Sequence, residues 1–329
     1  MAHMIDETTG RAAMAYTGLT PWHGLGQRID GDASVEEWRT AAGLNWTAER
    51  AEVKFAVGDG FDADLMTFED KHVLFRSDTR KPLSVVSSSY RIVQPADVLD
   101  FFRNMTERGH GKIETVGALS EGRRIWALAR LGENARVMDD EVAPYLMLAT
   151  SFDGSLATIA QFTSVRVVCN NTLQASLQNG AGQNRISVSH SAFFNPASVK
   201  SDLGLRVEAW EKFVADANTM AARKLSDSEA DAYILDLFAP FAPAGFDYTP
   251  ETARRSKGYR RVMELFAGGQ IGAGQDAIDR SAWGMLNAVT EFIDHHKGRS
   301  QDNRLDGAWF GEGTRVKARA LELAGKLAA

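Results

Sequence analysis

The hydrophobic pattern of this 329-residue chain changes its period near residue 192. Before that point, apolar and polar residues alternate over short stretches such as Trp46–Val57, which is typical of half-buried strands. After it, apolar residues recur at spacings of three and four, as in the series Val199, Leu203, Val207, Trp210, Val214 and Ala217. The change predicts an α+β fold. We expect an antiparallel-sheet-rich domain with hairpins and short helices over residues 1–191, and an all-helical domain over residues 192–329.

Local signals place the elements of the first part. A Ser34/Glu37 capping box predicts a short helix, and Gln94-Pro95 predicts the start of a second one. Asp153-Gly154 predicts a hairpin between strands at Tyr145–Phe152 and Leu156–Val168. Further strands are expected at residues 64–68, 72–77, 83–88, 112–119, 124–131 and 185–190. Cys169–Thr172 is expected to end a strand and begin a helix through Leu177.

Helix-start signals then repeat along the second part. They lie at Asn195-Pro196, at the Ser226/Glu229 capping box and at Thr249-Pro250. Apolar stripes predict two more helices, one from Trp283 to His296 and one from Thr314 to Leu327.

Composition narrows the class of protein. Hydrophobic residues make up 44% and charged residues 24%, which is typical of a globular chain with a large core. The net charge of −6 argues against a protein that coats duplex DNA through a basic surface. A single cysteine excludes an intramolecular disulfide, and no signal peptide is recognisable, so we expect the cytoplasm of a bacterial host. No apolar run reaches the roughly 18 residues of a membrane helix, so no membrane association is expected.

Residues Gly154 to Ser201 contain no aspartate or glutamate, although the average composition of the chain would place about six there. The segment keeps Arg166, Arg185 and Lys200, and it is rich in amide side chains. Because a carboxylate would repel an anion, such a segment suits an anionic ligand. Asn170, Asn171 and Thr172 can cap the expected helix and offer N–H donors beside Arg166. The plain alternative is a Ser/Thr/Asn-rich sheet whose charges lie elsewhere, with Arg166 paired to Asp153.

Two further groups of cations could extend a phosphate-binding surface. Arg91, Arg123 and Arg124 lie on neighbouring expected strands or turns. Arg254, Lys257 and Arg261 share one face if they stand on one helix. The alternative for the second group is a solvated face paired with Glu251 and Glu264. Trp22 is either a stacking platform or a core anchor.

Catalytic and metal sites are weaker hypotheses. Cys169, His190 and Asp153 would supply a nucleophile, a base and an orienting group, but their spacing matches no cysteine hydrolase pattern. Glu291, Asp294, His295 and His296 lack the spacing of a zinc helix, so no metal is expected. No phosphate-loop or dinucleotide glycine motif is present, and no cofactor is expected.

Five strings of the chain together carry a family resemblance. They are Thr20–Gly26, Ser89–Pro95, Asp153-Gly154, Arg166–Thr172 and Ala282–His295. In this order they resemble the phage/plasmid-like protein family, also called the domain of unknown function 932 family. The resemblance implies a gene carried on phages, plasmids and integrated elements, without a settled activity. The layout of residues 145–178 also resembles the core of ring-forming single-strand annealing proteins, which implies a positive groove and a homo-oligomer.

The leading hypothesis is therefore a non-enzymatic protein of a mobile element that binds or anneals single-stranded DNA in recombination or replication. Its expected contacts are the residues named above: Arg91, Arg123, Arg124, Arg166, Asn170, Asn171, Thr172, Arg185, Lys200, Arg254, Lys257 and Arg261. Two alternatives stay open. One is an enzyme acting on a nucleotide or nucleic acid through Asp153, Cys169 and His190. The other is a protein-binding module that counters a host system.

Overall fold

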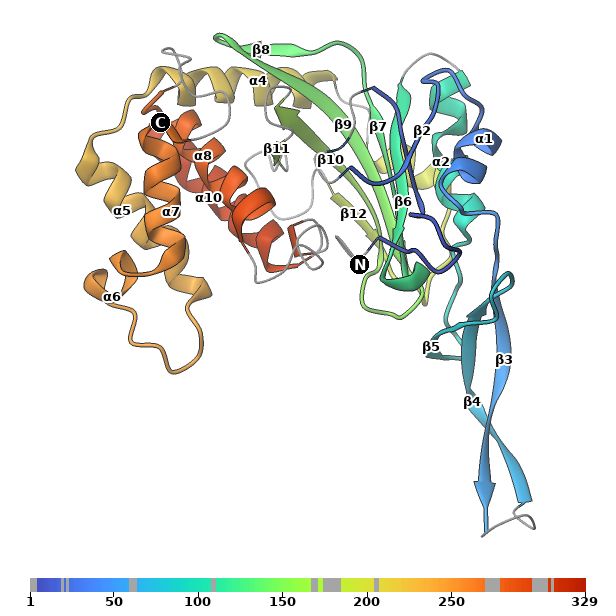
Figure 1. The fold of residues 1–329 in the computed structure, drawn as a ribbon. Helices are drawn as coiled ribbons and strands as arrows, with labels where there is room; N and C mark the ends of the chain where they lie inside the picture. Colours follow the sequence, from blue (N-terminus) through green and yellow to red (C-terminus); the bar gives the residue numbers. More distant parts are fainter. Residues whose placement is uncertain are drawn as a thin grey trace. The chain divides into compact units, whose positions relative to one another are not determined.

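The computed structural model of the protein shows a mixed architecture of strands followed by helices (Figure 1). It describes residues 5–18, 21, 24–58, 64–107, 111–166, 171–173, 185–203, 207–269, 279–297, 307–308 and 311–329. The α+β prediction is confirmed, because mostly antiparallel strands dominate the first part of the chain and helices the second. Within the described part, no helix is long and apolar enough to cross a membrane.

The chain forms two compact units. Unit 1 comprises residues 1–131, 146–161 and 185–203, and unit 2 comprises residues 132–145, 162–184 and 204–329. The expected boundary near residue 192 marks where helices replace strands along the sequence. As a domain boundary it stays a prediction.

Within the described residues, one nine-stranded sheet has the order β11-β10-β9-β7-β6-β1-β2, with β12 on β10 and β8 on β9. All its recorded pairings are antiparallel except that of β1 with β2. Its strands are β1 (Met14–Tyr16), β2 (Gln27–Arg28), β6 (Lys112–Leu119), β7 (Arg124–Arg130), β8 (Ala135–Val137), β9 (Asp140–Ser151), β10 (Thr158–Arg166), β11 (Asn171–Leu173) and β12 (Arg185–Val188).

Unit 1 also contains helices α1 (Val35–Ala41), α2 (Pro95–Glu107) and α3 (Pro196–Leu203). The predicted capping box of α1 is present, with Ser34 and Glu37 each bonding the backbone of the other. Helix α2 packs on β6 and β7 and buries Val98, Phe101 and Phe102. The 3-10 helix η3 (Ser120–Gly122) joins β6 to β7.

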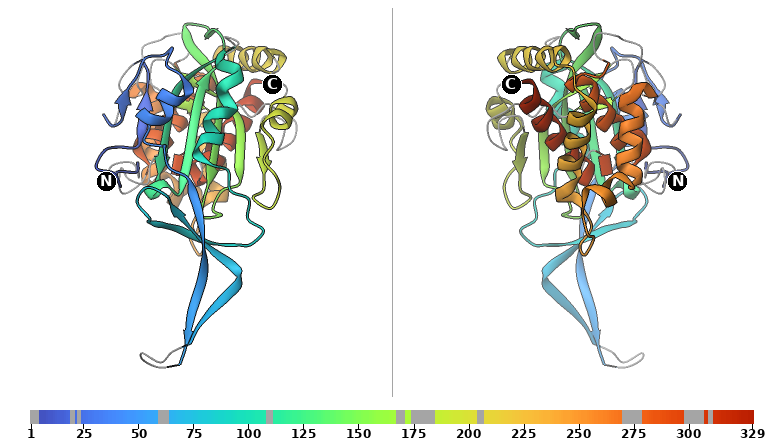
Figure 2. Two further views of the ribbon diagram at one scale, coloured as in Figure 1. Left: turned by 90° about the vertical axis from the view of Figure 1, so that its right-hand side faces the viewer. Right: turned by 90° about the vertical axis from the view of Figure 1, so that its left-hand side faces the viewer.

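A three-stranded sheet forms the rest of unit 1 in the described residues. It has the order β3-β4-β5, with β3 (Ala48–Val57), β4 (Asp64–Arg76) and β5 (Pro82–Ser87). Beyond β5, strands β3 and β4 continue as a two-stranded ribbon that projects from the rest of unit 1; we call β3 and β4 together the arm (Figure 2). The sequence predicts a half-buried strand over residues 46–57. That prediction is wrong for burial: the strand forms, but only Ala48 within β3 is buried.

A buried cation anchors the base of the arm. The Arg76 side chain is fully buried and donates hydrogen bonds to Asp78 at 2.9 and 2.7 Å and to Asp6. Its guanidinium also lies 4.5 Å from the centre of the Trp46 ring. Burial opposes the charge, but the bonds to Asp78 and Asp6 outweigh this and raise the pKa of Arg76.

Unit 2 is built around helix α8 (Ala282–Glu291), whose residues are buried on every side. Helix α8 packs against α10, α4, α7 and β11. The predicted Ser226/Glu229 capping box is present at the start of α5. The remaining elements of unit 2 are α4 (Val207–Ala222), α5 (Asp227–Phe238), η4 (Ala239–Phe241), α6 (Pro250–Arg254), α7 (Lys257–Glu264), η5 (Leu265–Gly269), η6 (Phe292–His296) and α10 (Glu312–Ala328).

The helix expected from Cys169 to Leu177 is wrong in its described part. Residues Asn171–Leu173 form strand β11, which pairs antiparallel with Ser164–Arg166 of β10. The reason is tertiary: the backbone at Asn171–Leu173 finds its partners on β10, and this pairing outweighs the local helix-start signal.

Candidate nucleic-acid interface

The turn between β9 and β10 is a polar platform in unit 1. The Asp153 carboxylate accepts a hydrogen bond from the Ser155 amide at 2.9 Å and another from the Ser155 hydroxyl. Gly154 has a φ of +72°, which glycine adopts without strain, within the six-residue connection between Ser151 and Thr158. Burial opposes ionisation, but the bonds from Ser155 outweigh it, so the pKa of Asp153 lies below its usual value.

Arg123 and Arg124 of the β6–β7 turn lie beside this platform, and Lys81 of the β4–β5 turn pairs with Glu121 of the same β6–β7 turn. Arg124 donates to the Ser155 hydroxyl at 3.1 and 3.0 Å, and the Arg123 carbonyl accepts the Phe152 amide at 2.8 Å. The Arg123 and Lys81 side chains flank the Glu121 carboxylate at 4.0 and 3.7 Å. These three side chains of Glu121, Arg123 and Lys81 are about half exposed, so their ion pairs are weak and solvated.

Arg91 is a fourth cation, and His190 connects its backbone to the same turn. Its Nδ1 lies 2.9 Å from the Arg91 carbonyl and its Nε2 lies 3.1 Å from the Leu156 carbonyl. The Arg91 backbone is therefore one imidazole ring away from the β9–β10 turn, and its side chain is exposed. Tyr90 stacks on His190 with ring centres 4.4 Å apart and donates to the Ser151 carbonyl at 2.7 Å. We call Lys81, Arg91, Arg123 and Arg124 around residues 151–156 the basic turn.

An exposed aromatic side chain follows His190 closely in the chain. Phe193 is 83% exposed, and the amide of Ala192 closes a turn onto the Ser189 carbonyl at 2.9 Å. Phe193 lies three positions after His190, which limits their Cα separation to about 11 Å. The neighbouring Phe194 packs on Phe101 instead, with ring centres 6.3 Å apart.

The basic turn therefore combines four cations with two carboxylates, those of Glu121 and Asp153. A surplus of exposed positive charge attracts phosphate oxygens, while an exposed aromatic ring offers a face on which a base can stack. The arrangement suits recognition of an anionic strand.

The acid-free segment is divided between the two units. Arg185 and Lys200 belong to unit 1, whereas Arg166, Asn171 and Thr172 belong to unit 2. Arg185 is exposed at the start of β12, opposite Gln161 of β10. For Arg166, Asn171, Thr172 and Lys200 the structure describes the backbone alone, and Asn170, Cys169 and Trp22 lie outside the described residues. Their contacts with a nucleic acid stay predictions.

The cations of residues 254–261 stand on two helices. Arg254 ends α6, and Ser256 caps α7, which carries Lys257 and Arg261. The single helical face expected for Arg254, Lys257 and Arg261 is therefore wrong, because the chain breaks at Ser256.

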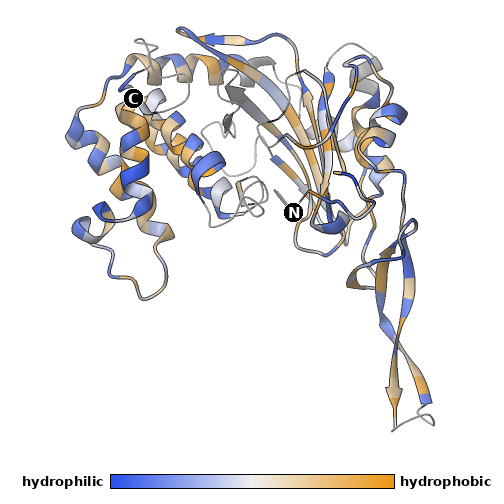
Figure 3. Ribbon diagram, in the orientation of Figure 1, coloured by the Kyte–Doolittle hydropathy of each residue, from blue (hydrophilic) through white to orange (hydrophobic). Residues whose placement is uncertain are grey.

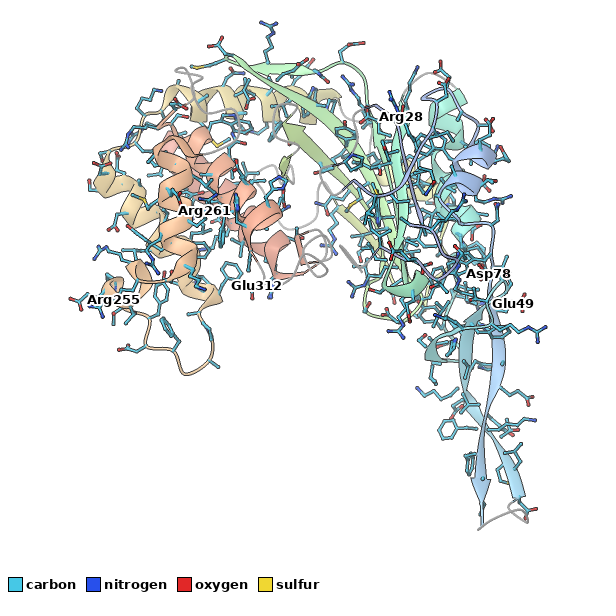
Figure 4. The ribbon with its side chains drawn as sticks, in the orientation of Figure 1. Arg28, Glu49, Asp78, Arg255, Arg261 and Glu312 are labelled. Atoms are coloured by element: carbon cyan, nitrogen blue, oxygen red, sulfur yellow. The ribbon has the colours of Figure 1, made fainter. Side chains whose placement is uncertain are left out.

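Two of these cations already form ion pairs within unit 2. Arg254 binds Asp231 through two hydrogen bonds of 2.8 and 2.7 Å, and Arg261 pairs with Glu264 at 2.7 Å. Figure 4 shows Arg261 against the helices and Arg255 pointing away from them. Arg255, Lys257 and Arg260 are exposed, so they form the basic patch that unit 2 offers to solvent.

The Glu291–His296 group is held by internal pairs. His296 lies 3.4 Å from Glu291 and 3.3 Å from Arg261, and Lys317 donates to Asp294 at 2.8 Å. Burial and the Arg261 charge lower the pKa of His296. In the described part of the chain, no group of three or more histidine, cysteine or acidic residues is placed to hold a metal ion.

The alternative catalytic group is not assembled among its described members. His190 uses both ring nitrogens on backbone carbonyls, whereas Asp153 bonds to Ser155. A general base needs a ring nitrogen directed at its substrate or nucleophile. With Cys169 outside the described residues, a thiol-dependent activity stays a prediction.

Sequence reasoning missed two members of the interface. Lys81 follows Asp78-Thr79-Arg80 in the β4–β5 turn, and only the fold brings it to Glu121. Phe193 reads as an ordinary apolar residue before a helix. The sequence does offer one indication of its exposure. Phe193 lies between the polar residues Ser189-His190-Ser191 and the Asn195 helix cap, where neither a strand nor a helix is expected to bury its side chain.

The fold and the basic turn thus define a mixed α+β protein with an exposed cationic surface on a sheet end. The chain belongs to the family described as domain of unknown function DUF932, whose model matches residues 82–309. The string Thr20–Gly26 lies outside this match. No curated protein and no solved structure matches the chain.

Proposed function

We propose that this protein binds single-stranded nucleic acid through the basic turn. The observation that carries the proposal is that Arg91, Arg123 and Arg124 come from two separate segments to residues 151–156, through His190, the Phe152 amide and the Ser155 hydroxyl. Lys81 adds a further cation, because it pairs with Glu121 of the turn that carries Arg123. The phosphates of the strand pair with these cations, which accounts for binding by a chain whose net charge is −6.

A preference for single strands follows from Phe193. An exposed aromatic ring beside cations binds unpaired bases by stacking, whereas a duplex hides its base faces. We further propose that the protein acts in a mobile element, where the corresponding steps are strand annealing, recombination or replication.

The test is fluorescence anisotropy of labelled single-stranded and duplex oligonucleotides at about 50 and about 200 mM salt. The test variant is the double substitution Arg91→Gln and Arg123→Gln, which removes two charges without touching a buried group. Loss of two phosphate contacts lowers the salt slope of a single strand by about 1.4. The matched control is Arg255→Gln with Lys257→Gln, which removes the same charge from unit 2.

Phe193→Ala separates stacking from charge. It weakens single-strand binding by about 1–3 kcal/mol and leaves its salt slope unchanged. The proposal fails if the wild-type protein binds no oligonucleotide at the lower salt concentration. It also fails if the unit 2 control loses as much affinity as the basic-turn variant.

A further inference from the structure

Apolar side chains are exposed along the arm. Nine large apolar side chains in the described part of the chain are at least 38% exposed, and five of them lie on β3 and β4. They are Phe55, Val57, Leu65, Met66 and Phe68. Figure 3 shows apolar residues on both strands of the arm. Exposure concentrated in this way marks an interaction surface rather than scattered surface residues.

Most of these side chains share one face of the ribbon. Side chains at alternate positions of a strand point to the same side, and directly paired residues share a side. Val53 pairs with Phe68, and Phe55 pairs with Met66. Together with Val57, these residues form what we call the apolar arm face.

Carboxylates stand at both ends of the apolar arm face. At the tip, Asp64 pairs with Val57 and therefore lies on the same side of the ribbon. Toward the base, Glu69 and Asp70 follow Phe68 directly in the chain. All three acidic residues are exposed. The apolar stretch is therefore bounded by negative charge at each end.

The lysines next to this stretch leave most of its charge uncompensated. From Phe55 to Asp70 the sequence holds five acidic residues and no lysine or arginine. Extending the stretch to residues 52–71 adds Glu52, Lys54 and Lys71, so six acidic residues stand against two lysines and the net charge is −4. Lys54 lies on the opposite face of the ribbon and already pairs with Glu52 at 3.4 Å.

Charge decides which class of partner covers the face. Nucleic acid and anionic lipid surfaces carry the same sign of charge as the arm and are repelled by it. A second arm is repelled for the same reason, because stacking brings Asp64, Glu69 and Asp70 of two copies together. A partner with lysine or arginine at both ends of an apolar stretch is attracted, since each cation meets a carboxylate.

The dimensions of the face fit one α-helix. From Val53 to Val57 the strand rises by about 14 Å, a length that about nine residues of a helix span. The two strands lie about 4.8 Å apart, so a helix about 10 Å wide covers the side chains of both. A helix also satisfies its own backbone hydrogen bonds, whereas a strand laid flat on this face would leave its N–H and C=O groups unpaired.

We propose that the apolar arm face binds an amphipathic helix of a partner protein, with lysine or arginine at each end of its apolar stripe. The stripe covers Phe55, Met66 and Phe68 and removes them from water. The cations pair with Asp64 at one end and with Glu69 at the other. The contact also supports the arm, because an uncovered two-stranded ribbon is only marginally stable in water.

Leu65 offers a control within the arm itself. It pairs with Ala56 and lies on the face opposite the apolar arm face. Its side chain is 66% exposed, compared with 45% for Phe55 and 50% for Met66. A partner that covers only the apolar arm face leaves Leu65 untouched, whereas unspecific adsorption of an apolar molecule would involve Leu65 as well.

The experiment is fluorescence anisotropy of a labelled synthetic peptide mixed with the full chain. The peptide is about 14 residues long, with leucines at positions i, i+3, i+4 and i+7 and lysines at both ends. One control peptide carries glutamates in place of the lysines, and a second carries serines in place of the leucines. We expect the wild-type chain to bind the first peptide and neither control peptide.

One pair of variants tests the apolar part of the contact. Phe55→Ser with Met66→Ser should weaken peptide binding at least about tenfold, because it removes most of the apolar surface that the peptide covers. Leu65→Ser should change the binding less than about twofold. Circular dichroism of both variants checks that they fold.

A second pair tests the charges and keeps the apolar arm face intact. Asp64→Asn with Glu69→Gln should weaken peptide binding about threefold to tenfold, since exposed ion pairs contribute modestly. The matched control is Glu133→Gln with Asp139→Asn, which removes the same charge from exposed residues of unit 2. This control should bind the peptide like the wild type.

The proposal is overturned if the wild-type chain does not bind the lysine–leucine peptide, or binds the glutamate peptide equally well. It also fails if either control variant loses as much affinity as its test variant. Self-association in sedimentation velocity, or binding to neutral lipid vesicles, would assign the face to a second copy or to lipid instead if Phe55→Ser with Met66→Ser abolished it. The basic-turn variant Arg91→Gln with Arg123→Gln should bind the peptide normally, because the arm contact is independent of nucleic-acid binding.

Discussion

Lys317 of α10 donates a hydrogen bond of 2.8 Å to Asp294 of η6, and both side chains are almost completely buried. Two opposite charges therefore lie inside the helical core of unit 2. Their mutual attraction offsets the cost of removing each from water, but neither is tolerated there alone.

Lys317→Met is expected to lower the free energy of unfolding by about 3–5 kcal/mol, because it leaves the Asp294 carboxylate buried without its cation. The double variant Lys317→Met with Asp294→Leu should recover most of that loss. Urea unfolding followed by circular dichroism measures both. A double variant no more stable than the single one would contradict this account of the pair.

Gly122→Ala should disturb the turn that presents Arg123 and Arg124. Gly122 has a φ of +89°, and an added Cβ would lie 3.0 Å from Arg76 Nη1 and 3.1 Å from the Trp46 ring. Backbone strain and the contact together should cost about 2 kcal/mol or more. The control is Gly154→Ala, which also has a positive φ but meets no atom within 4 Å. Thermal unfolding should show a clearly larger loss for Gly122→Ala than for this control.

His190→Phe should destabilise unit 1 by about 1–3 kcal/mol. The substitution keeps an aromatic ring on Tyr90 but removes the two ring nitrogens that contact the Arg91 and Leu156 carbonyls, and with them at least one N–H donor. The Ser151 hydroxyl still donates to the Leu156 carbonyl. Differential scanning calorimetry gives the loss. An unchanged melting temperature would mean that solvent replaces the hydrogen bond lost from the imidazole.

Asp231 gives unit 2 a defined acid response. Hydrogen bonds from Arg254 and then Tyr259 lower the pKa of Asp231 from 3.8 to about 2. The folded pKa lies below the unfolded value, so the stabilisation is complete above about pH 4 and is lost as the pH falls toward 2. Asp231→Asn should therefore be less stable than the wild type at pH 7, and the two should converge between about pH 4 and pH 2. A difference that stays constant through this window would contradict the role of the Asp231 charge.

Local signals predicted the helix starts well. The Ser34/Glu37 and Ser226/Glu229 capping boxes form as expected, because both partners lie within four residues of each other. A hairpin forms around Asp153-Gly154 as predicted, but its connection runs from Phe152 to Ala157 and distant residues help to hold it, since the Phe152 amide donates to the Arg123 carbonyl at 2.8 Å.

Long-range pairing explains what the sequence could not predict. Asn171–Leu173 becomes a strand because it pairs with β10, and no residue close to it in the sequence indicates this pairing. The basic turn also depends on distant segments, since Lys81 reaches Glu121 and Arg124 reaches Ser155 only after strands β5, β7, β9 and β10 take their places. Alternation in residues 48–57 predicted the strand, but alternation does not say whether anything covers its apolar side.

The arm is also the part of unit 1 that we expect to open first. A ribbon held mainly by its own ladder of hydrogen bonds opens more readily than the sheet around β7, so its amides should exchange with solvent early. Hydrogen exchange at residues 53–57 and 64–68 would therefore report the local stability of the arm separately from that of the sheet around β7, without any added label.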